Sequence, residues 1–239
     1  MKTIIVIPTY NEAVNIKKLI HEIFLQNIRN LHIIVVDDSS SDGTGLIVQQ
    51  MEKQFPITLI QRQNKQGLGS AYVAGFYKAF ALGAECIFEM DADFSHDPND
   101  IKKMITEMHN VDLIIGSRKI AGGHIVGWNW IRRCMSNGAM FFARTLLNLQ
   151  TKDVTSGFRC YRRSALETIL SRPISSNGYA FQEEMLYRVE QSGYRVKEIP
   201  VTFVDRKDGK SKLSKKDIWE FFIVMIRLKF EQRRHSSLR

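Results

Sequence analysis

The chain has 239 residues, of which 44% are hydrophobic and 25% are charged, a composition typical of a folded globular protein and not of a disordered one. Its formal net charge of +9 favours acidic partners, but no zinc-finger spacing and no aromatic RNP-type strand accompanies the basic residues, so we expect no nucleic-acid partner. The three cysteines lie far apart without C-x-x-C spacing, which disfavours a disulfide framework or a zinc site and indicates a reducing, cytoplasmic compartment.

The first part of the chain alternates between predicted strands and predicted helices. Short apolar runs that end at turn residues predict strands over residues 2–8, 31–36, 57–60, 86–90 and 111–115. Apolar residues at helical spacing follow each of the first four runs. This alternation predicts an α/β fold with a doubly wound, mostly parallel sheet flanked by helices.

The pattern changes after residue 118. The remaining predicted elements are a glycine-rich loop over the site at 120–127, a long helix at 128–149, a turn leading into a strand at 155–161, an amphipathic helix at 178–191 and a strand interrupted by proline at 196–204. We expect the long helix to point apolar residues, among them Trp130, Met135 and Phe141, into the core.

Carboxylates stand where predicted strands end. Asp91 and Asp93 follow the fourth strand directly, and Asp38 lies just after the second. Because ligands bind at the carboxyl ends of the strands in open α/β sheets, we expect these side chains to line one site. Two carboxylates at i and i+2 on a turn can aim at one Mg²⁺ or Mn²⁺ ion, whose other ligands are water and substrate phosphate. The alternative is an acidic loop in which Asp97 only caps the next helix.

The C-terminal segment combines apolar and basic residues. We expect residues 1–213 to form the catalytic domain and residues 214–239 to form a separate C-terminal segment. Charged residues interrupt the apolar ones in this segment, so we expect no membrane span. We also expect no secretion, because no cationic leader precedes the first strand. The segment is interpreted either as a last core helix or as a helix that lies on an anionic membrane. Both interpretations hold if Trp219 and Phe222 face inward while Phe230 faces lipid. The basic residues that would face headgroups are Arg227, Lys229, Arg233, Arg234 and Arg239.

Eight short motifs in order, spread over nearly the whole chain, resemble the inverting glycosyltransferases of family 2, and within them the dolichol-phosphate or polyprenol-phosphate mannosyltransferase group. The motifs are I-P-T-Y-N-E (7–12), V-D-D-S-S-S-D-G-T (36–44), N-K-Q-G-L-G-S-A (64–71), M-D-A-D-F-S-H-D-P (90–98), G-S-R (116–118), S-G-F-R (156–159), G-Y-A-F-Q-E-E (178–184) and V-D-R-K-D-G-K-S-K-L (204–213). The resemblance implies a glycosyltransferase-A-type fold and transfer of a hexose, mannose from GDP-mannose above all, to a polyprenyl or dolichyl phosphate with inversion.

The resemblance also implies roles for individual residues. The set for the nucleotide-diphospho-sugar donor is Pro8, Tyr10, Glu12, Val36, Asp38, Met90, Asp91, Ala92, Asp93, Arg206 and Lys212. The set for a divalent cation is Asp91, Asp93 and Ser95, and the set for the acceptor phosphate is Arg118, Arg132, Arg133 and Ser136. Of these, Asp91, Asp93 and Arg118 are the expected catalytic residues.

Acceptor chemistry leaves alternatives open. A phosphate acceptor is already anionic near neutral pH and needs cationic side chains, whereas a sugar hydroxyl needs a carboxylate base. Glu183 and Glu184 are either that base, in an enzyme of polysaccharide or glycolipid synthesis, or charges that favour a helix N-terminus. A nucleotide-binding protein without sugar transfer is the third hypothesis. With a lipid phosphate acceptor, we expect a peripheral protein at the cytoplasmic face of a membrane, held by anionic lipid or by a membrane-protein partner.

Overall fold

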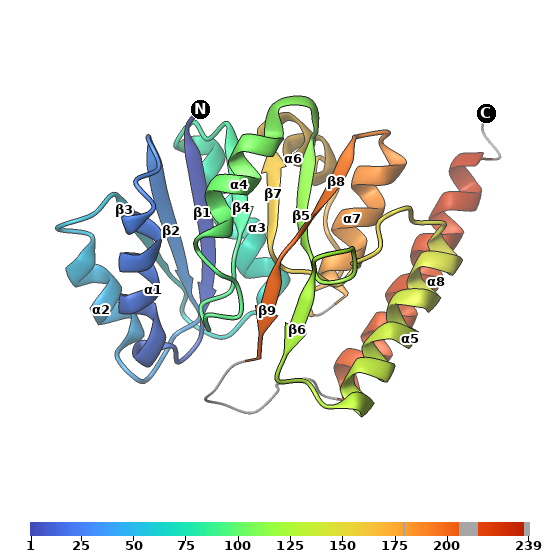
Figure 1. The fold of residues 1–239 in the computed structure, drawn as a ribbon, viewed down its shortest axis with the longest axis horizontal. Coiled ribbons are helices and arrows are strands. Elements are labelled where there is room, and N and C mark those ends of the chain that lie inside the picture. The colour runs from blue at the N-terminus through green and yellow to red at the C-terminus, as the bar shows by residue number, and fades with distance from the viewer. Residues whose placement is uncertain (179, 206–214, 237–239) are drawn as a thin grey trace.

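The predicted alternation of strands and helices is present in a computed structural model of the chain, which describes residues 1–178, 180–205 and 215–236 (Figure 1). The main sheet has the strand order β3-β2-β1-β4-β7-β5-β8. Its strands are β1 (Thr3–Thr9), β2 (Leu31–Asp37), β3 (Ile57–Gln61), β4 (Cys86–Glu89), β5 (Leu113–Ser117), β7 (Arg159–Arg162) and β8 (Val196–Pro200). Only β7 runs antiparallel to its neighbours, β4 and β5. The prediction of a doubly wound, mostly parallel sheet is confirmed.

Helices cover both faces of this sheet (Figure 1). One face carries α1 (Ala13–Leu25), α2 (Thr44–Met51) and α4 (Asp100–Glu107), which a 3₁₀ turn (Met108–Asn110) extends; the other carries α3 (Leu68–Ala81), α6 (Arg163–Leu170) and α7 (Phe181–Gln191). Successive side chains of β1 alternate between the two layers, Ile4 and Val6 packing on the second and Ile5 and Ile7 on the first. Because both faces are covered, the strand is apolar at successive positions, and its sequence reads as a continuous apolar run.

A second, two-stranded sheet lies beside the end of the main one. It pairs β6 (His124–Val126) in parallel with β9 (Thr202–Val204). The strand predicted over 196–204 is thus divided after Pro200, at Val201, since β8 belongs to the main sheet and β9 to the small one. The glycine-rich loop predicted at 120–127 is correspondingly wrong at residues 124–126, which form β6.

Two long helices, α5 (Trp130–Leu147) and α8 (Lys215–Ser236), run side by side at the edge of the molecule (Figure 1). The prediction that Trp130, Met135 and Phe141 face the core is wrong: their side chains are 73%, 57% and 72% exposed. The buried stripe of α5 is Met140, Ala143 and Leu147. Helical spacing identified an apolar helix, but α5 packs through one stripe only, and its remaining apolar residues lie at the surface.

The helix α8 also buries one stripe and exposes another. Phe221, Val224, Met225 and Leu228 are buried in the core, whereas Trp219 is 70% and Phe222 40% exposed. The condition under which both interpretations of this segment would hold, with Trp219 and Phe222 facing inward, is therefore not met. The proposed domain boundary at 213/214 lies outside the described residues. Within the described part of the chain, no helix combines the length and apolarity that crossing a bilayer requires.

Candidate active site

A cavity of about 530 Å³ opens at the carboxyl ends of β1, β2 and β4, at the sheet edge where a ligand was predicted. The register that pairs Thr9 with Asp37 brings the ends of β1 and β2 together, and Asp91 follows β4, the neighbour of β1 on its other side. The residues that line the cavity are Pro8, Thr9, Tyr10, Glu12, Asp38, Lys65, Gln66, Gly67, Leu68, Ala71, Asp91, Ala92, Asp93, Asn177, Gly178 and Glu220.

The two aspartates of the D-x-D motif both line this cavity. The Tyr72 hydroxyl donates a hydrogen bond to Oδ1 of Asp91 at 3.2 Å, and the Ser95 backbone N–H donates to Oδ1 of Asp93 at 3.1 Å. Phe94, directly after Asp93, has a left-handed φ of 60°, so the chain turns sharply here. The carboxylates are therefore oriented by the protein and lie on the cavity wall.

The carboxylate pair fits a hard divalent cation that is shared with a bound substrate. Mg²⁺ is usually held by one or two carboxylates together with water and substrate phosphates. Among the described residues no group of three or more His, Cys, Asp or Glu side chains is arranged as a metal site. Ser95, the third predicted ligand, is buried and does not line the cavity, and its Oγ has no hydrogen-bond partner among the described residues. What Ser95 contributes is its backbone contact to Asp93.

Most residues of the predicted donor set surround the cavity. Pro8, Tyr10, Glu12, Asp38 and Ala92 line it together with the two aspartates. Val36 and Met90 do not, because they are buried in the two core layers. The predicted phosphate ligands Arg206 and Lys212 lie outside the described residues.

Asp38 is held by the loop before α3. Its carboxylate forms a short ion pair with Arg62 and accepts the Gln66 backbone N–H at 3.2 Å. Arg62 also donates to the Ser70 hydroxyl at 2.6 Å and to the Gly67 carbonyl at 3.1 Å. The Nζ atom of Lys65 lies 4.2 Å from the centroid of the Tyr10 ring. Tyr10, Asp38 and this loop consequently form one wall.

The predicted acceptor residues form a second cluster, outside the cavity lining, around Trp128. The guanidinium of Arg118 lies 5.6 Å and that of Arg132 4.3 Å from the Trp128 ring centroid. Arg132 also pairs with Asp205 at 2.7 Å. Arg133 instead donates to the backbone carbonyls of Trp128 at 3.2 Å and of Ile125 at 2.6 Å. It therefore stabilises the backbone around Trp128. The two adjacent arginines thus have different contacts.

Arg118 makes more hydrogen bonds within the protein than the sequence indicated. Its Nε and one Nη donate to the two carboxylate oxygens of buried Asp153 at 2.8 and 2.6 Å, and the same Nη donates to Thr155 at 2.7 Å. Burial raises the pKa of Asp153, but the hydrogen bonds and charge of Arg118 outweigh it and hold that pKa below its ordinary value. Ser136, one helical turn after Arg132, is half-buried. Asp153 and Trp128 were not identified from the sequence.

A buried polar network lies behind the aspartates. Arg159 is fully buried and donates to the carbonyls of Val154, Ser156 and Gln182, while the Gln182 amide donates to Glu89 at 2.7 Å. Burial raises the pKa of Glu89 to about 7 and that of Glu183 to about 8, although Arg159 opposes both shifts. At pH 7 Glu183 is therefore mostly protonated, and Glu89 is close to its midpoint.

His96 connects the cavity with the Trp128 cluster through its contacts. Its ring stacks on Phe158 at 4.9 Å, lies edge-on to Phe203 at 6.2 Å and accepts the Asp91 backbone N–H on Nδ1 at 3.2 Å. Phe203 is also the ring beneath Arg118, at 5.3 Å. Burial lowers the pKa of His96 to about 4. The two halves of the site are thus joined through neutral aromatic side chains.

Several lining residues were missed or given no role in the sequence analysis. Lys65, Gln66 and Gly67 lie in the 64–71 motif, which signalled the loop but not its contacts. Asn177 and Glu220 had no local signal, because they reach the cavity from parts of the chain far from the strands whose ends it occupies.

Comparison with known proteins adds independent findings. Residues 4–170 match the family model described as Glycosyl transferase family 2. The chain is 38% identical over 222 residues to a polyprenol monophosphomannose synthase of Mycolicibacterium smegmatis, covering 92% of this chain and 83% of that one. It is 37% identical over 215 residues to an undecaprenyl-phosphate mannosyltransferase of Micrococcus luteus, covering 90% and 88%.

Solved structures with low sequence identity share the fold. The chain is similar to glucosyl-3-phosphoglycerate synthase from Mycobacterium tuberculosis in complex with Mn²⁺, UDP-glucose and phosphoglyceric acid, with a TM-score of 0.67 and 14% identity over 95% of this chain and 79% of that one. It is also similar to mannosyl-3-phosphoglycerate synthase from Rubrobacter xylanophilus, with a TM-score of 0.64 and 17% identity over 100% and 76%.

Proposed function

Because the chain belongs to glycosyl transferase family 2, we propose that it transfers mannose from a nucleotide diphosphate to a polyprenyl phosphate, with inversion at the anomeric carbon. The resemblance read from the motifs is confirmed, and so are the glycosyltransferase activity and the glycosyltransferase-A-type fold that it implied. The observation that carries the specific reaction is the similarity, over about nine-tenths of this chain, to two relatives whose names combine mannose with a polyprenol or its phosphate.

The donor is proposed to occupy the cavity, with GDP-mannose as the expected nucleotide sugar. Tyr10, Glu12 and Asp38 would contact the base and ribose, and Asp91 and Asp93 would hold Mg²⁺ or Mn²⁺ together with the diphosphate. When bound, such an ion neutralises charge that grows on the leaving diphosphate. The protein's own part is to present two oriented carboxylates beside the nucleotide wall.

The acceptor is proposed to be a lipid phosphate bound near Arg118 and Arg132. A phosphate monoester has a second pKa of about 6 and attacks as an anion, so it requires cationic ligands and no proton acceptor. The contacts of the two candidate bases agree with this. Glu184 accepts hydrogen bonds from Ser175 and Ser176, and Glu183 is buried with its pKa raised to about 8, which leaves it protonated at neutral pH. Neither glutamate is therefore a ready base for a hydroxyl acceptor.

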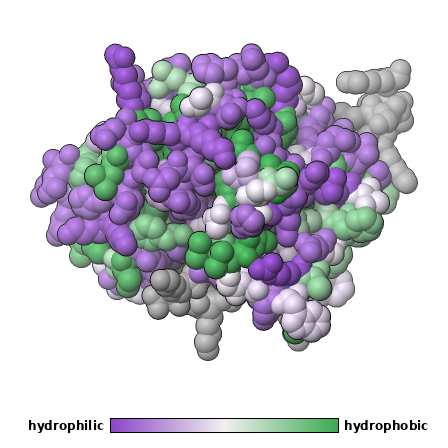
Figure 2. Space-filling view, viewed as in Figure 1, coloured by the Kyte–Doolittle hydropathy of each residue, from purple (hydrophilic) through white to green (hydrophobic). Residues whose placement is uncertain are grey.

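A membrane surface is the proposed location of the reaction. Nine of the sixteen exposed large hydrophobic side chains in the described part of the chain belong to α5 and α8. On α5 they are Trp130, Ile131, Met135 and Phe141, and on α8 Trp219, Phe222, Ile223, Ile226 and Phe230. In Figure 2, pale green and white residues interrupt the hydrophilic surface on the side where these helices lie, and stronger green lies elsewhere in the same view. Such a face beside Arg132 suits a lipid acceptor that stays in its bilayer.

The proposal is tested by supplying radiolabelled GDP-mannose, UDP-glucose or UDP-mannose with polyprenyl phosphate, free polyprenol or a neutral sugar, and extracting the product into organic solvent. We expect extractable label only with polyprenyl phosphate, and most of it from GDP-mannose. A polar product formed from the neutral sugar would favour the hydroxyl-acceptor enzyme. Nucleotide binding without any product would favour the binding protein.

A further inference from the structure

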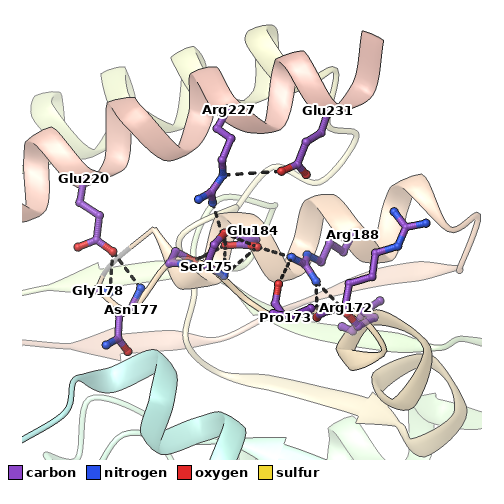
Figure 3. Close-up of polar contacts among 12 residues, drawn as sticks. Arg172, Pro173, Ser175, Asn177, Gly178, Glu184, Arg188, Glu220, Arg227 and Glu231 are labelled. Atoms are coloured by element: carbon purple, nitrogen blue, oxygen red, sulfur yellow. Dashed lines mark hydrogen bonds and ion pairs between the residues drawn. The ribbon is translucent and has the colours of Figure 1, made fainter. Parts of the chain in front are cut away.

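The C-terminal helix contributes a side chain to the donor cavity. Glu220, in the second turn of α8, lines the cavity although it lies more than 120 residues after the D-x-D motif. Its Oε1 atom accepts the backbone N–H groups of Asn177 at 2.9 Å and Gly178 at 3.0 Å, as Figure 3 shows. Hydrogen bonds to a carboxylate are stronger than those between neutral groups. One carboxylate therefore fixes two successive peptide groups of the cavity wall.

The segment that Glu220 holds is itself bonded to the opposite part of the wall. The Asn177 side chain donates to the Gln66 carbonyl at 2.6 Å and accepts the Ser70 N–H at 2.9 Å, and the Asn177 carbonyl accepts the Gly69 N–H at 3.1 Å. Asn177 thereby ties the loop after α6 to the loop before α3. A displacement at residue 177 must be passed to Gln66.

The two loops fit together with almost no free space. A Cβ atom on Gly69 would lie 2.9 Å from the Ser176 carbonyl oxygen, and one on Gly67, which has a left-handed φ of 99°, would lie 3.0 Å from the Asn177 side chain. Backbone packed this closely transmits a shift of one loop to the other. The loop before α3 carries Lys65, which lies against Tyr10, and Gln66, whose N–H donates to Asp38.

Further contacts on the same helix set where Glu220 lies. Arg227 reaches Glu184 at 3.5 Å, and Glu184 in turn accepts the Ser175 and Ser176 N–H groups and pairs with Arg188 at 2.6 Å (Figure 3). The segment from residue 175 to residue 178 is thus joined to α8 at two places, directly through Glu220 and, by way of Glu184, through Arg227.

From these contacts we propose that Glu220 is a positioning residue of the donor site: α8 holds the nucleotide wall in its binding shape through the amides of Asn177 and Gly178. The inference rests on the proposed function, because it takes a nucleotide diphosphate sugar as the ligand of the cavity. Removal of Glu220 leaves the D-x-D motif and the Trp128 cluster intact, so it weakens the donor and spares the acceptor. Through Glu220, the helix α8, which also carries exposed apolar residues, becomes part of the donor site.

The test compares the full-length wild-type protein with Glu220→Ala, Glu220→Gln and the control Glu107→Gln, which removes the same charge from α4 at a residue that pairs with Lys197 and does not line the cavity. Affinity for GDP and for UDP is measured by calorimetry in Mn²⁺, and KM values for donor and acceptor are measured separately. For Glu220→Ala we expect donor Kd and KM to rise about tenfold, with acceptor KM and kcat changed less than about twofold. Glu220→Gln keeps an acceptor oxygen and should recover most of the affinity, and Glu107→Gln should behave as wild type.

Wild-type donor affinity in folded Glu220→Ala, or an equal loss in Glu107→Gln, would overturn the proposal. If Glu220→Ala does not fold, Glu220→Asp replaces it, because its shortened side chain cannot reach both amides and should weaken the donor in the same direction. Unchanged affinity in Glu220→Asp would likewise overturn the proposal. The binding measurement needs no lipid, so a wild-type protein that binds nucleotide but makes no lipid product would refute the proposed function alone.

Discussion

Glu183 separates the two acceptor chemistries, and the substitution Glu183→Gln tests which one applies. Burial raises the pKa of this side chain to about 8, against its own backbone hydrogen bond and the charge of Arg159. At pH 7 the group is therefore a neutral acid, which glutamine replaces with nearly the same shape and no charge. A general base contributes about 10² to 10⁴ in rate, so the loss of one would be obvious. We expect the variant to retain activity within about threefold.

The raised pKa also fixes how stability depends on pH. Below pH 4.5, the ordinary pKa of this carboxyl group, the folded and unfolded chains both keep the proton; between that pH and about 8 the unfolded chain loses it while the folded chain keeps it. The free energy of unfolding therefore falls as pH rises, by about 1.4 kcal/mol per pH unit from this group alone. Between pH 5.5 and 7.5 wild type should lose about 3 kcal/mol relative to Glu183→Gln.

Urea unfolding of wild type and Glu183→Gln at pH 5.5 and 7.5 measures the effect on stability. Sugar-transfer rates of the two proteins at pH 7 measure the effect on activity. Glu89 titrates in the same direction but is present in both proteins, so the difference between them isolates Glu183. Glu184→Gln is a control of opposite sign. Burial raises the pKa of Glu184, but its contacts with Ser176 and Arg188 outweigh this, so its stabilisation is present at neutral pH and is lost in acid. A folded Glu183→Gln variant that is inactive, with wild-type pH dependence of stability, would refute the reasoning.

Three further predictions follow from the site and the surface. Asp93→Asn should reduce turnover at least about 100-fold while the melting temperature stays near that of wild type, since the carboxylate lies on a cavity wall; full activity of the variant, or of wild type in excess chelator, would contradict this. Arg132→Ala should raise acceptor KM about tenfold and leave donor KM unchanged, and an equal change in both would remove the acceptor assignment. The intact protein should sediment with anionic vesicles at low salt, be released at high salt and lose binding when residues 231–239 are deleted; indifference to vesicles would mean that another protein brings it to its lipid.

The sequence predicted the sheet and its acidic edge because both signals are local. The run that ends at Asp91 reads as a buried strand from its own residues, and parallel pairing then places its end beside those of the first two strands. The strand β6 has only three residues and is defined by its pairing with β9, so no periodicity of its own could reveal it.

Side-chain partners far apart in sequence were beyond the reach of spacing. Arg118 was identified as a basic residue after a strand, but its partner Asp153 lies 35 residues later and is fully buried. The exposure of Trp130 and Trp219 was missed for a related reason, since helical spacing shows an apolar stripe but not which stripe the core covers. Glu220 belonged to a segment read as helix or membrane contact, and only the folded chain brings it to the cavity.

The central claim is inverting transfer of a sugar to a lipid phosphate, and the structure of the product tests it most directly. The purified protein is incubated with GDP-mannose, Mg²⁺ or Mn²⁺ and polyprenyl phosphate, and the lipid product is analysed by mass spectrometry and by NMR of the anomeric centre. We predict one mannosyl residue in a phosphodiester, with an anomeric configuration opposite to that in the donor. A retained configuration, or mannose linked to any group other than the phosphate, would contradict the account.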